Sequence, residues 1–292
     1  MKKVGLIGHN GMCGKELLKL LPKETKIFSR DEPLIFSDLD ILFMAISSED
    51  TLTIAELALN ENVRLIDLSS AFRTNSLFPL ILPKVNSHLI NNSLKLISLP
   101  NCIVSILLTV LNPLHKIARI KKIILSTYQA ASGAGNVGLE AMNSYETIPP
   151  FPHPLRDNLF LHESKKNLNC LCGEEEKIVF EIKKILDVPH IPISVRCVRL
   201  PIKRAHSIHA IVTFEQNIHN VNELLALEPG IIMHPSPTPK MAEEKEEVFV
   251  APVRKDPSDE NTYDFWIVGD QILRGSVLNA FEAYTEIKKA HH

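Results

Sequence analysis

The sequence has few cysteines, no long apolar run and almost no excess of charge, and each of these absences narrows the class of protein. Five cysteines in 292 residues are too few, and odd in number, for a disulfide framework. Lys and Arg total 32 against 34 Asp and Glu, so the formal net charge is −2. Nothing in this balance indicates bulk binding to nucleic acid or to a membrane. We therefore expect an ordinary globular protein with neither as a partner.

The N-terminus and the cysteine spacing also argue against secretion and against zinc. Two lysines precede a short apolar stretch that glycine interrupts at Gly8, which is too short for the core of a signal peptide. The longest apolar run, 103–111, meets Asn112-Pro113, where we expect its helix to end well short of a membrane span. Cys170 and Cys172 have no second pair at zinc-binding spacing. We expect a cytoplasmic protein without a metal ion.

Cys102 is the first candidate for chemistry, because of the segment around it. Leu99-Pro100-Asn101-Cys102 leads directly into the apolar run, which predicts a strand, a turn and a buried helix whose first turn carries the thiol. Unpaired N–H groups and the helix dipole at that position favour the thiolate, which is the nucleophilic form. A lone cysteine is more often a small buried hydrophobe, so both interpretations stay open at this point.

The first thirty residues predict a dinucleotide-binding unit. Val4-Gly5-Leu6-Ile7 has the composition of a buried strand, glycines follow at positions 8, 11 and 14, and leucines at 17, 18, 20 and 21 form a helical stripe. Glycines let the backbone turn sharply and approach a pyrophosphate, which then lies at the helix N-terminus. The cofactor-binding residues expected in this turn are Gly8, Asn10, Gly11, Met12 and Gly14.

The end of the second predicted strand, 25–28, bears on the choice between NAD and NADP. Ser29 and Arg30 follow it directly, and a hydroxyl beside an arginine favours the 2′-phosphate of NADP. Asp31 keeps NAD as the alternative, since an acid at this position binds the 2′-hydroxyl of NAD.

The pattern of predicted elements changes near residue 115. Before it, strands at 39–45 and 63–67 alternate with a short helix at 56–59, which predicts a parallel sheet with helices on both faces. After it, the sequence predicts a strand, a long loop region, a helix, three antiparallel strands and a closing helix; these lie at 121–129, 143–161, 174–186, 195–200, 209–214, 265–268 and 271–288.

Two further segments carry polar residues at strand ends. Arg199 on a predicted strand is followed seven residues later by His206, and Gln129 lies where a strand enters a small-residue loop that ends at Gly135. Taken separately, the arginine fits a surface ion and the histidine a surface or core residue.

Together these segments resemble the aspartate-semialdehyde dehydrogenase family. The resemblance covers essentially the whole chain and rests on the glycine turn and on segments 69–73, 83–86, 100–102, 126–135, 174–177, 197–206 and 278–280. It implies an α/β protein with a Rossmann-like dinucleotide-binding domain, residues 1–101 with 272–292, and an inserted mixed α/β (α+β) catalytic and dimerisation domain, residues 102–271. It further implies a homodimer formed through the inserted domain.

The activity that the resemblance implies is a reversible reductive dephosphorylation. 4-Aspartyl phosphate, NADPH and a proton give aspartate 4-semialdehyde, NADP and phosphate, on the route to lysine, diaminopimelate, threonine and methionine. By this resemblance Cys102 is the nucleophile that displaces phosphate and forms a thioester, His206 is the general acid/base, and Gln129 orients the acyl group.

The same resemblance assigns the substrate and cofactor contacts. Arg199 binds the α-carboxylate, Glu174, with its neighbour Glu175 as the alternative, binds the α-ammonium, and Lys177 binds phosphate. The remaining assignments are Arg73 for phosphate, Asn101 for substrate, and Ser132, Gly133 and Asn279 for the cofactor. From spacing alone, Glu174 and Lys177 would be a surface ion pair of little energetic value.

Some residues depart from the family pattern, and two alternatives stay open. Ile103 and Val104 stand where small hydroxyl residues are usual, Ala205 stands where a glycine-like residue is usual, and 45–48 replaces a more glycine-rich loop. One alternative is an enzyme like N-acetyl-glutamyl-phosphate reductase, which shares the chemistry. The other is a catalytically inert nucleotide-binding paralogue, although such a protein would normally have lost Cys102, Gln129 or His206.

Overall fold

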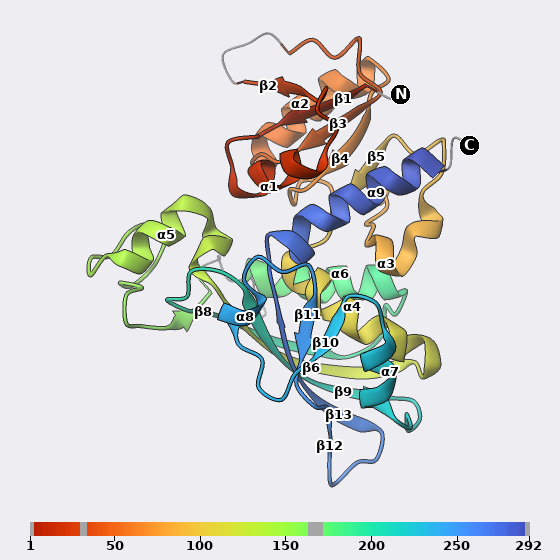
Figure 1. Ribbon diagram of the computed structural model, residues 1–292, viewed down its shortest axis with the longest axis vertical. Helices are drawn as coiled ribbons and strands as arrows, with labels where there is room; N and C mark the ends of the chain where they lie inside the picture. Colours follow the sequence, from red (N-terminus) through yellow and green to blue (C-terminus); the bar gives the residue numbers. More distant parts are fainter. Residues whose placement is uncertain (1–2, 30–33, 163–171, 290–292) are drawn as a thin grey trace. The chain divides into compact units, whose positions relative to one another are not determined.

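The computed structural model describes residues 3–29, 34–162 and 172–289, and the chain divides into two compact units (Figure 1). Unit 1 comprises Met1–Asn101 with Ser276–His292, and unit 2 comprises Cys102–Gly275. The sequence predicts that the chain re-enters the first domain at residue 272. In the structure it re-enters unit 1 at Ser276.

Unit 1 contains a five-stranded sheet in the order β2-β1-β3-β4-β5, in which every neighbouring pair is parallel. The strands are β1 Val4–Ile7, β2 Lys26–Phe28, β3 Ile41–Met44, β4 Arg64–Asp67 and β5 Leu96–Ser98. The order reverses on either side of β1, so the switch point of the sheet lies at the carboxyl ends of β1 and β3, where doubly wound sheets bind their ligands. The sequence-based prediction of a parallel sheet is confirmed.

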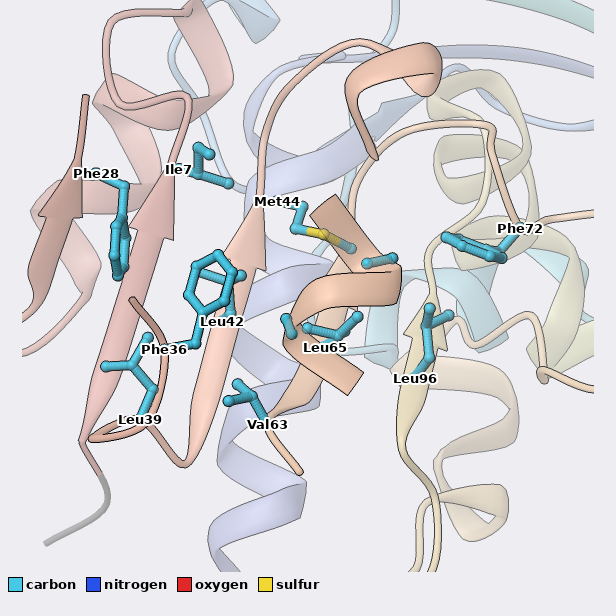
Figure 2. Close-up of a cluster of buried hydrophobic side chains, with 12 residues drawn as sticks. Ile7, Phe28, Phe36, Leu39, Leu42, Met44, Val63, Leu65, Phe72 and Leu96 are labelled. Carbon is cyan, nitrogen blue, oxygen red and sulfur yellow. The ribbon is translucent and has the colours of Figure 1, made fainter. Parts of the chain in front are cut away.

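Helices cover both faces of this sheet, as the alternation of strand side chains requires. They are α1 Met12–Leu20, α2 Ser48–Asn60, α3 Pro83–Asn86 and α9 Leu278–Lys289, with a short 3₁₀ turn η1 at Ser87–Leu89. Leu42 and Met44 belong to a buried apolar cluster that also takes in Ala55 of α2 (Figure 2). Phe43 points the other way and meets Tyr284 of α9, with ring centroids 5.8 Å apart. The segment after residue 275 therefore contributes to the core of unit 1.

Unit 2 is built on an eight-stranded mixed sheet in the order β10-β11-β13-β9-β6-β8-β7, with β12 paired to β13. The strands are β6 Ile120–Gln129, β7 Phe160–Leu161, β8 Ile193–Arg199, β9 His206–Phe214, β10 Ile231–Met233, β11 Val248–Val250, β12 Arg254–Lys255 and β13 Thr262–Gly269. β9 and β13 pair antiparallel, as the sequence predicts. The segment expected as an antiparallel strand at 195–200 is β8, which pairs antiparallel with β7 but parallel with its other neighbour β6.

The helices of unit 2 include two long ones that pack against this sheet and each other. The set is α4 Cys102–Ile117, α5 Gly135–Asn143, α6 Gly173–Leu186, α7 Val221–Leu227 and α8 Pro239–Ala242, with η2 at Ala131–Ala134 and a π-turn η3 at Leu273–Val277. None of the helices described is long and apolar enough to cross a membrane.

The expected end of the helix at Asn112-Pro113 is wrong, since α4 continues through Pro113 to Ile117. A proline inside a helix costs about 3 kcal/mol, but α4 is buried along almost its whole length, and Leu114 beyond the proline is fully buried. Each buried leucine contributes about 1.5–3 kcal/mol, so burial of this helix outweighs the cost of the proline.

Candidate active site

The strand register of unit 2 brings Gln129, Arg199 and His206 to one end of the sheet. Gln129 is the last residue of β6 and pairs with Arg199, the last residue of the parallel strand β8. His206 begins β9 on the other side of β6, where its neighbour Ser207 pairs with Tyr128. All three side chains are almost fully buried. Three polar residues that are far apart in sequence therefore lie on adjacent strands, on the buried face.

Cys102 lies at the same end of unit 2, because α4 begins there. Ile106, one turn further along the helix, packs against Gly269, which pairs with His206 in the sheet. A Cβ atom on Gly275 would lie only 2.7 Å from the Cβ of Cys102, so the chain after β13 passes directly against the first residue of the helix. Cys102 itself is half-buried. The predicted nucleophile and the three polar residues thus belong to one unit and one end of its sheet.

His206 has a fixed tautomer and is neutral near pH 7. Its Nδ1 accepts a hydrogen bond from the backbone N–H of Ala130 at 3.0 Å, so the ring proton resides on Nε2. Burial, followed by the positive charge of Arg199, lowers the pKa of His206 to about 3. Within the described residues its buried Nε2 has no hydrogen-bond partner. A donor buried without a partner is costly, and it is the arrangement expected where a ligand atom completes the site.

Arg199 is fully buried, and groups from two segments, 130–133 and 151–162, surround its guanidinium. Nη1 donates to the carbonyl of Ala130 at 2.8 Å, Nη2 lies 3.0 Å from Nε2 of His162, and the ring of Phe151 lies 6.0 Å from Cζ. A Cβ on Gly133 would lie 3.2 Å from Nη1 of Arg199. Because Gly133 has no side chain, it leaves room for the guanidinium. The family resemblance assigns this glycine to the cofactor.

The loop before His206 is fixed by a glutamine that the sequence did not single out. Gln271 Oε1 accepts the backbone N–H of Ala205 at 2.7 Å, and its Nε2 donates to the hydroxyl of Ser132 at 2.6 Å. Ala205 has a φ of +68°, in the left-handed region where glycine is favoured. This explains why the family pattern has a glycine-like residue here. Ser132, predicted to contact the cofactor, holds the two loops together through Gln271.

The two candidate glutamates on α6 differ in their contacts. Glu175 is buried and accepts the backbone N–H of Cys172 at 3.0 Å and that of Cys197 at 3.1 Å, so it anchors the start of the helix to β8. Glu174 is half-buried and Lys177 is exposed, three positions further along the same helix. Glu175 therefore has a structural role at the start of α6, and the assignment of Glu174 to the substrate stays a prediction.

The predicted phosphate turn of unit 1 has the geometry that a pyrophosphate needs. Gly8 has a φ of +90°, and a Cβ on Gly14 would lie 2.1 Å from the carbonyl oxygen of Gly8. Gly8, Asn10, Gly11 and Ser29 line a cavity of about 950 Å³ at the carboxyl ends of β1 to β3. Met12 is the first residue of α1. A cradle that admits no side chain at two glycines fits a dinucleotide.

His9 is a residue of this turn that sequence reasoning missed. It lines the same cavity, and within the described part of the chain its buried Nδ1 has no hydrogen-bond partner. Arg30 and Asp31, on which the preference between NADP and NAD depends, lie outside the described residues.

The other predicted contacts also belong to unit 1 and are buried: Arg73, Asn101 and Asn279. Arg73 donates from Nε to the carbonyl of Ser69 at 3.0 Å and from Nη2 to that of Leu68 at 3.3 Å, so its own loop fixes the guanidinium. His162 and Gln271 in unit 2 gave no signal in the sequence, because neither belongs to a recognisable motif and β7 is only two residues long.

Known proteins match this chain in both units. The model of the semialdehyde dehydrogenase NAD binding domain matches residues 22–93, and that of the semialdehyde dehydrogenase dimerisation domain matches residues 111–274. An aspartate-semialdehyde dehydrogenase of Rickettsia bellii is 33% identical, over 100% of this chain and 91% of that protein.

Solved structures share the fold. Aspartate semialdehyde dehydrogenase II of Vibrio cholerae, complexed with ASA, matches 100% of this chain and 99% of its own at a TM-score of 0.93 and 24% identity. The Candida albicans enzyme, solved with NADP, matches 99% of each chain at a TM-score of 0.75 and 18% identity. Since both family models match and one-third identity to a relative extends over the full length, the chain belongs to the aspartate-semialdehyde dehydrogenase family.

Proposed function

We propose that this chain reduces 4-aspartyl phosphate to aspartate 4-semialdehyde with release of phosphate, and runs the reverse reaction under suitable conditions. The observation that carries the proposal is the grouping of Cys102 with buried Gln129, Arg199 and His206 at one end of the sheet of unit 2. This set supplies a nucleophile, a cation for a carboxylate and a neutral hydrogen-bond donor. Those are the three groups that an acyl phosphate with an α-carboxylate requires.

Substrate capture depends on charge. The guanidinium of Arg199 can bind the α-carboxylate through two parallel N–H···O bonds, and its burial makes that pairing stronger than it would be in water. Glu174 at the start of α6 is placed to attract the α-ammonium, and Lys177 and Arg73 are the candidates for the phosphate.

The covalent step forms one bond and breaks one. The thiolate of Cys102 attacks the acyl carbon, the bond from carbon to the phosphate oxygen breaks, and phosphate leaves a thioester on Cys102. The nicotinamide, when bound, supplies the hydride that reduces this thioester. The thiolate is regenerated as the bond between carbon and sulfur breaks and the aldehyde departs.

His206 has a narrower role in this scheme than that of a free acid/base. Its proton is on Nε2 while Nδ1 accepts from Ala130, so the side chain can donate a hydrogen bond to the carbonyl oxygen as that oxygen gains negative charge. The loss of that proton would leave an imidazolate. The lowered pKa of His206 keeps its ring neutral, which supports a role as hydrogen-bond donor.

The cofactor that binds in unit 1 is a nicotinamide dinucleotide, and we propose that it is NADP. Ser29, which lines the cavity, and Arg30 follow the second strand, as a 2′-phosphate site requires. Titration of the protein with NADPH and with NADH, followed by nucleotide fluorescence, tests this. Equal affinities for the two would overturn it.

The activity is tested with purified protein, aspartate semialdehyde, phosphate and NADP, and Cys102→Ala separates chemistry from binding. The variant is expected to lose turnover entirely and to bind NADPH with an unchanged dissociation constant, because Cys102 is not among the residues that line the dinucleotide cavity. Residual turnover in the variant would remove Cys102 as nucleophile. Preference for N-acetylglutamate semialdehyde by the wild type would favour the alternative reductase, and inactivity on both aldehydes would favour the inert paralogue.

The assembly that we propose is a homodimer formed through the sheet of unit 2. On β6 the odd-numbered positions from 123 to 129 are buried, whereas Ile124 and Tyr128 point to the opposite face. Ile211 pairs with Ile124, and Trp266 lies 5.6 Å from Tyr128 between ring centroids. These four partly exposed side chains lie on one face of the sheet, where Ser126 and His209 lie between Ile124 and Tyr128. We call this face the sheet patch, and it lies within the region that the dimerisation-domain model matches.

A further inference from the structure

We propose that His162 is a positioning residue for the substrate, which holds the guanidinium of Arg199 in the plane that the α-carboxylate requires. This inference rests on the proposed function, and it adds a residue that belongs to none of the sequence segments on which the family resemblance depends.

The contact between the two side chains has only one consistent proton arrangement. Nε2 of His162 lies 3.0 Å from Nη2 of Arg199. A guanidinium only donates, so Nε2 of His162 accepts and the imidazole is neutral with its proton on Nδ1. Nη1 donates at the same time to the carbonyl of Ala130 at 2.8 Å. Each terminal nitrogen of Arg199 is thus fixed by an acceptor from a different segment, and two such contacts define the plane of the fork.

The backbone holds His162 firmly enough to act in this way. β7 pairs antiparallel with β8, with Phe160 opposite Arg199, and the backbone N–H of His162 donates to the carbonyl of Cys197 at 2.9 Å. The ring of Phe151, which packs near Phe160 with centroids 6.0 Å apart, lies 6.0 Å from Cζ of Arg199. The segment from Phe151 to His162 therefore forms one wall around the guanidinium.

The orientation of the fork matters because the carboxylate contact is bidentate. Two parallel N–H···O bonds need the guanidinium and carboxylate planes to coincide, and a tilted guanidinium keeps its charge but loses one bond. Loss of one hydrogen bond to a charged group corresponds to roughly tenfold or more in affinity. Because the carboxylate is bound equally in the ground state and the transition state, we expect the loss in KM rather than in kcat.

The experiment compares His162→Leu, which removes the acceptor, with His162→Gln, whose Oε1 can accept from Nη2. His162→Leu should raise KM for aspartate semialdehyde roughly tenfold with little change in kcat, and His162→Gln should recover most of that loss. His153→Leu is the matched control: His153 lies on the same segment and stacks edge-on against Phe160, with centroids 6.1 Å apart. It should leave KM unchanged.

Two substrate analogues separate positioning from a general defect. Succinate semialdehyde keeps the carboxylate and lacks the ammonium, whereas 3-aminopropanal keeps the ammonium and lacks the carboxylate. The His162→Leu penalty should persist with the first and disappear with the second. An equal penalty on both, or an unchanged KM for aspartate semialdehyde, would overturn the proposal.

The remaining outcomes are also decisive. If thermal denaturation shows that His162→Leu is unstable, the positioning role is tested by comparing KM in His162→Gln and His162→Asn. The shorter side chain of Asn cannot place an acceptor at the position of Nε2. Equal KM values in those two variants would overturn the positioning role. A wild type inactive on aspartate semialdehyde would instead overturn the proposed function, and calorimetric binding of succinate semialdehyde to the same variants would then still test His162.

Discussion

At the scale of single residues, His206 shows how surroundings set a charge. Its pKa is about 3 in the folded protein, from 6.5 for an unperturbed group, chiefly because it is buried. Between these values the unfolded chain binds more protons than the folded one, so stability is retained above pH 6.5 and falls as the pH decreases below it. The loss is at most ~1.4 kcal/mol for each pH unit in that window.

Chemical unfolding at pH 7 and pH 5 checks this for the wild type and for His206→Asn. The wild type should lose more stability on acidification than the variant, because the variant lacks the group that must remain uncharged. If both proteins lost the same free energy of unfolding between pH 7 and pH 5, His206 would not be the cause of the loss of stability in acid.

Ala205 gives a second prediction at this scale. Its φ of +68° places a Cβ in the left-handed region, which costs roughly 1–2 kcal/mol for a residue other than glycine. Glycine loses about 0.5–1 kcal/mol through greater freedom of the unfolded chain. Ala205→Gly should therefore raise the free energy of unfolding by up to ~1 kcal/mol with kcat/KM preserved, measured by urea denaturation and by the standard assay. A destabilised variant would contradict the argument from strain.

The sequence could indicate Cys102, Arg199 and His206 because each belongs to a segment with recognisable spacing. His162 and Gln271 could not be found in this way. Each acts through a single contact that only the paired strands and the returning loop create, so no local pattern marks either residue.

At the scale of elements, the glycine turn between β1 and α1 allows a matched test. A Cβ at Gly14 would lie 2.1 Å from the carbonyl oxygen of Gly8, whereas one at Gly11 would have nothing closer than 3.4 Å. Gly14→Ala should therefore lower the melting temperature and weaken NADPH binding, because the turn must open to admit the methyl group. Gly11→Ala should leave the melting temperature nearly unchanged. Similar losses of stability in both variants would refute the argument from close approach.

Most strands were predictable from apolar runs, and most errors concerned helices and pairing. The strand predicted at 121–129 is β6 Ile120–Gln129, since a buried strand needs only a local run of apolar residues. The helix predicted at 56–59 is α2 Ser48–Asn60, because Ser47 caps it through the backbone N–H of Asp50 and its first turns are polar. The pairing of β8 with β6 depends on contacts between distant segments, and no local pattern carries that information.

At the scale of the whole molecule, the sheet patch leads to a prediction about assembly. Ile124 is 40% exposed and lies within the patch, whereas Leu227 on α7 is 83% exposed and lies outside it. Ile124→Glu should convert the dimer to monomer in light scattering after size exclusion, because a charge in an apolar interface is left without solvation. Leu227→Glu should leave the mass unchanged. A dimer that survives Ile124→Glu would place the interface elsewhere.

The order of the chain also bears on how the protein is made. Unit 1 needs α9, which follows the whole of unit 2, while its five strands all come from the first 101 residues. While the chain is being translated, the strands of unit 1 exist before α9 does. The face of the sheet that carries Phe43 then lacks its contact with Tyr284. The core of unit 1 is therefore complete only once α9 has been synthesised, although all five of its strands come first.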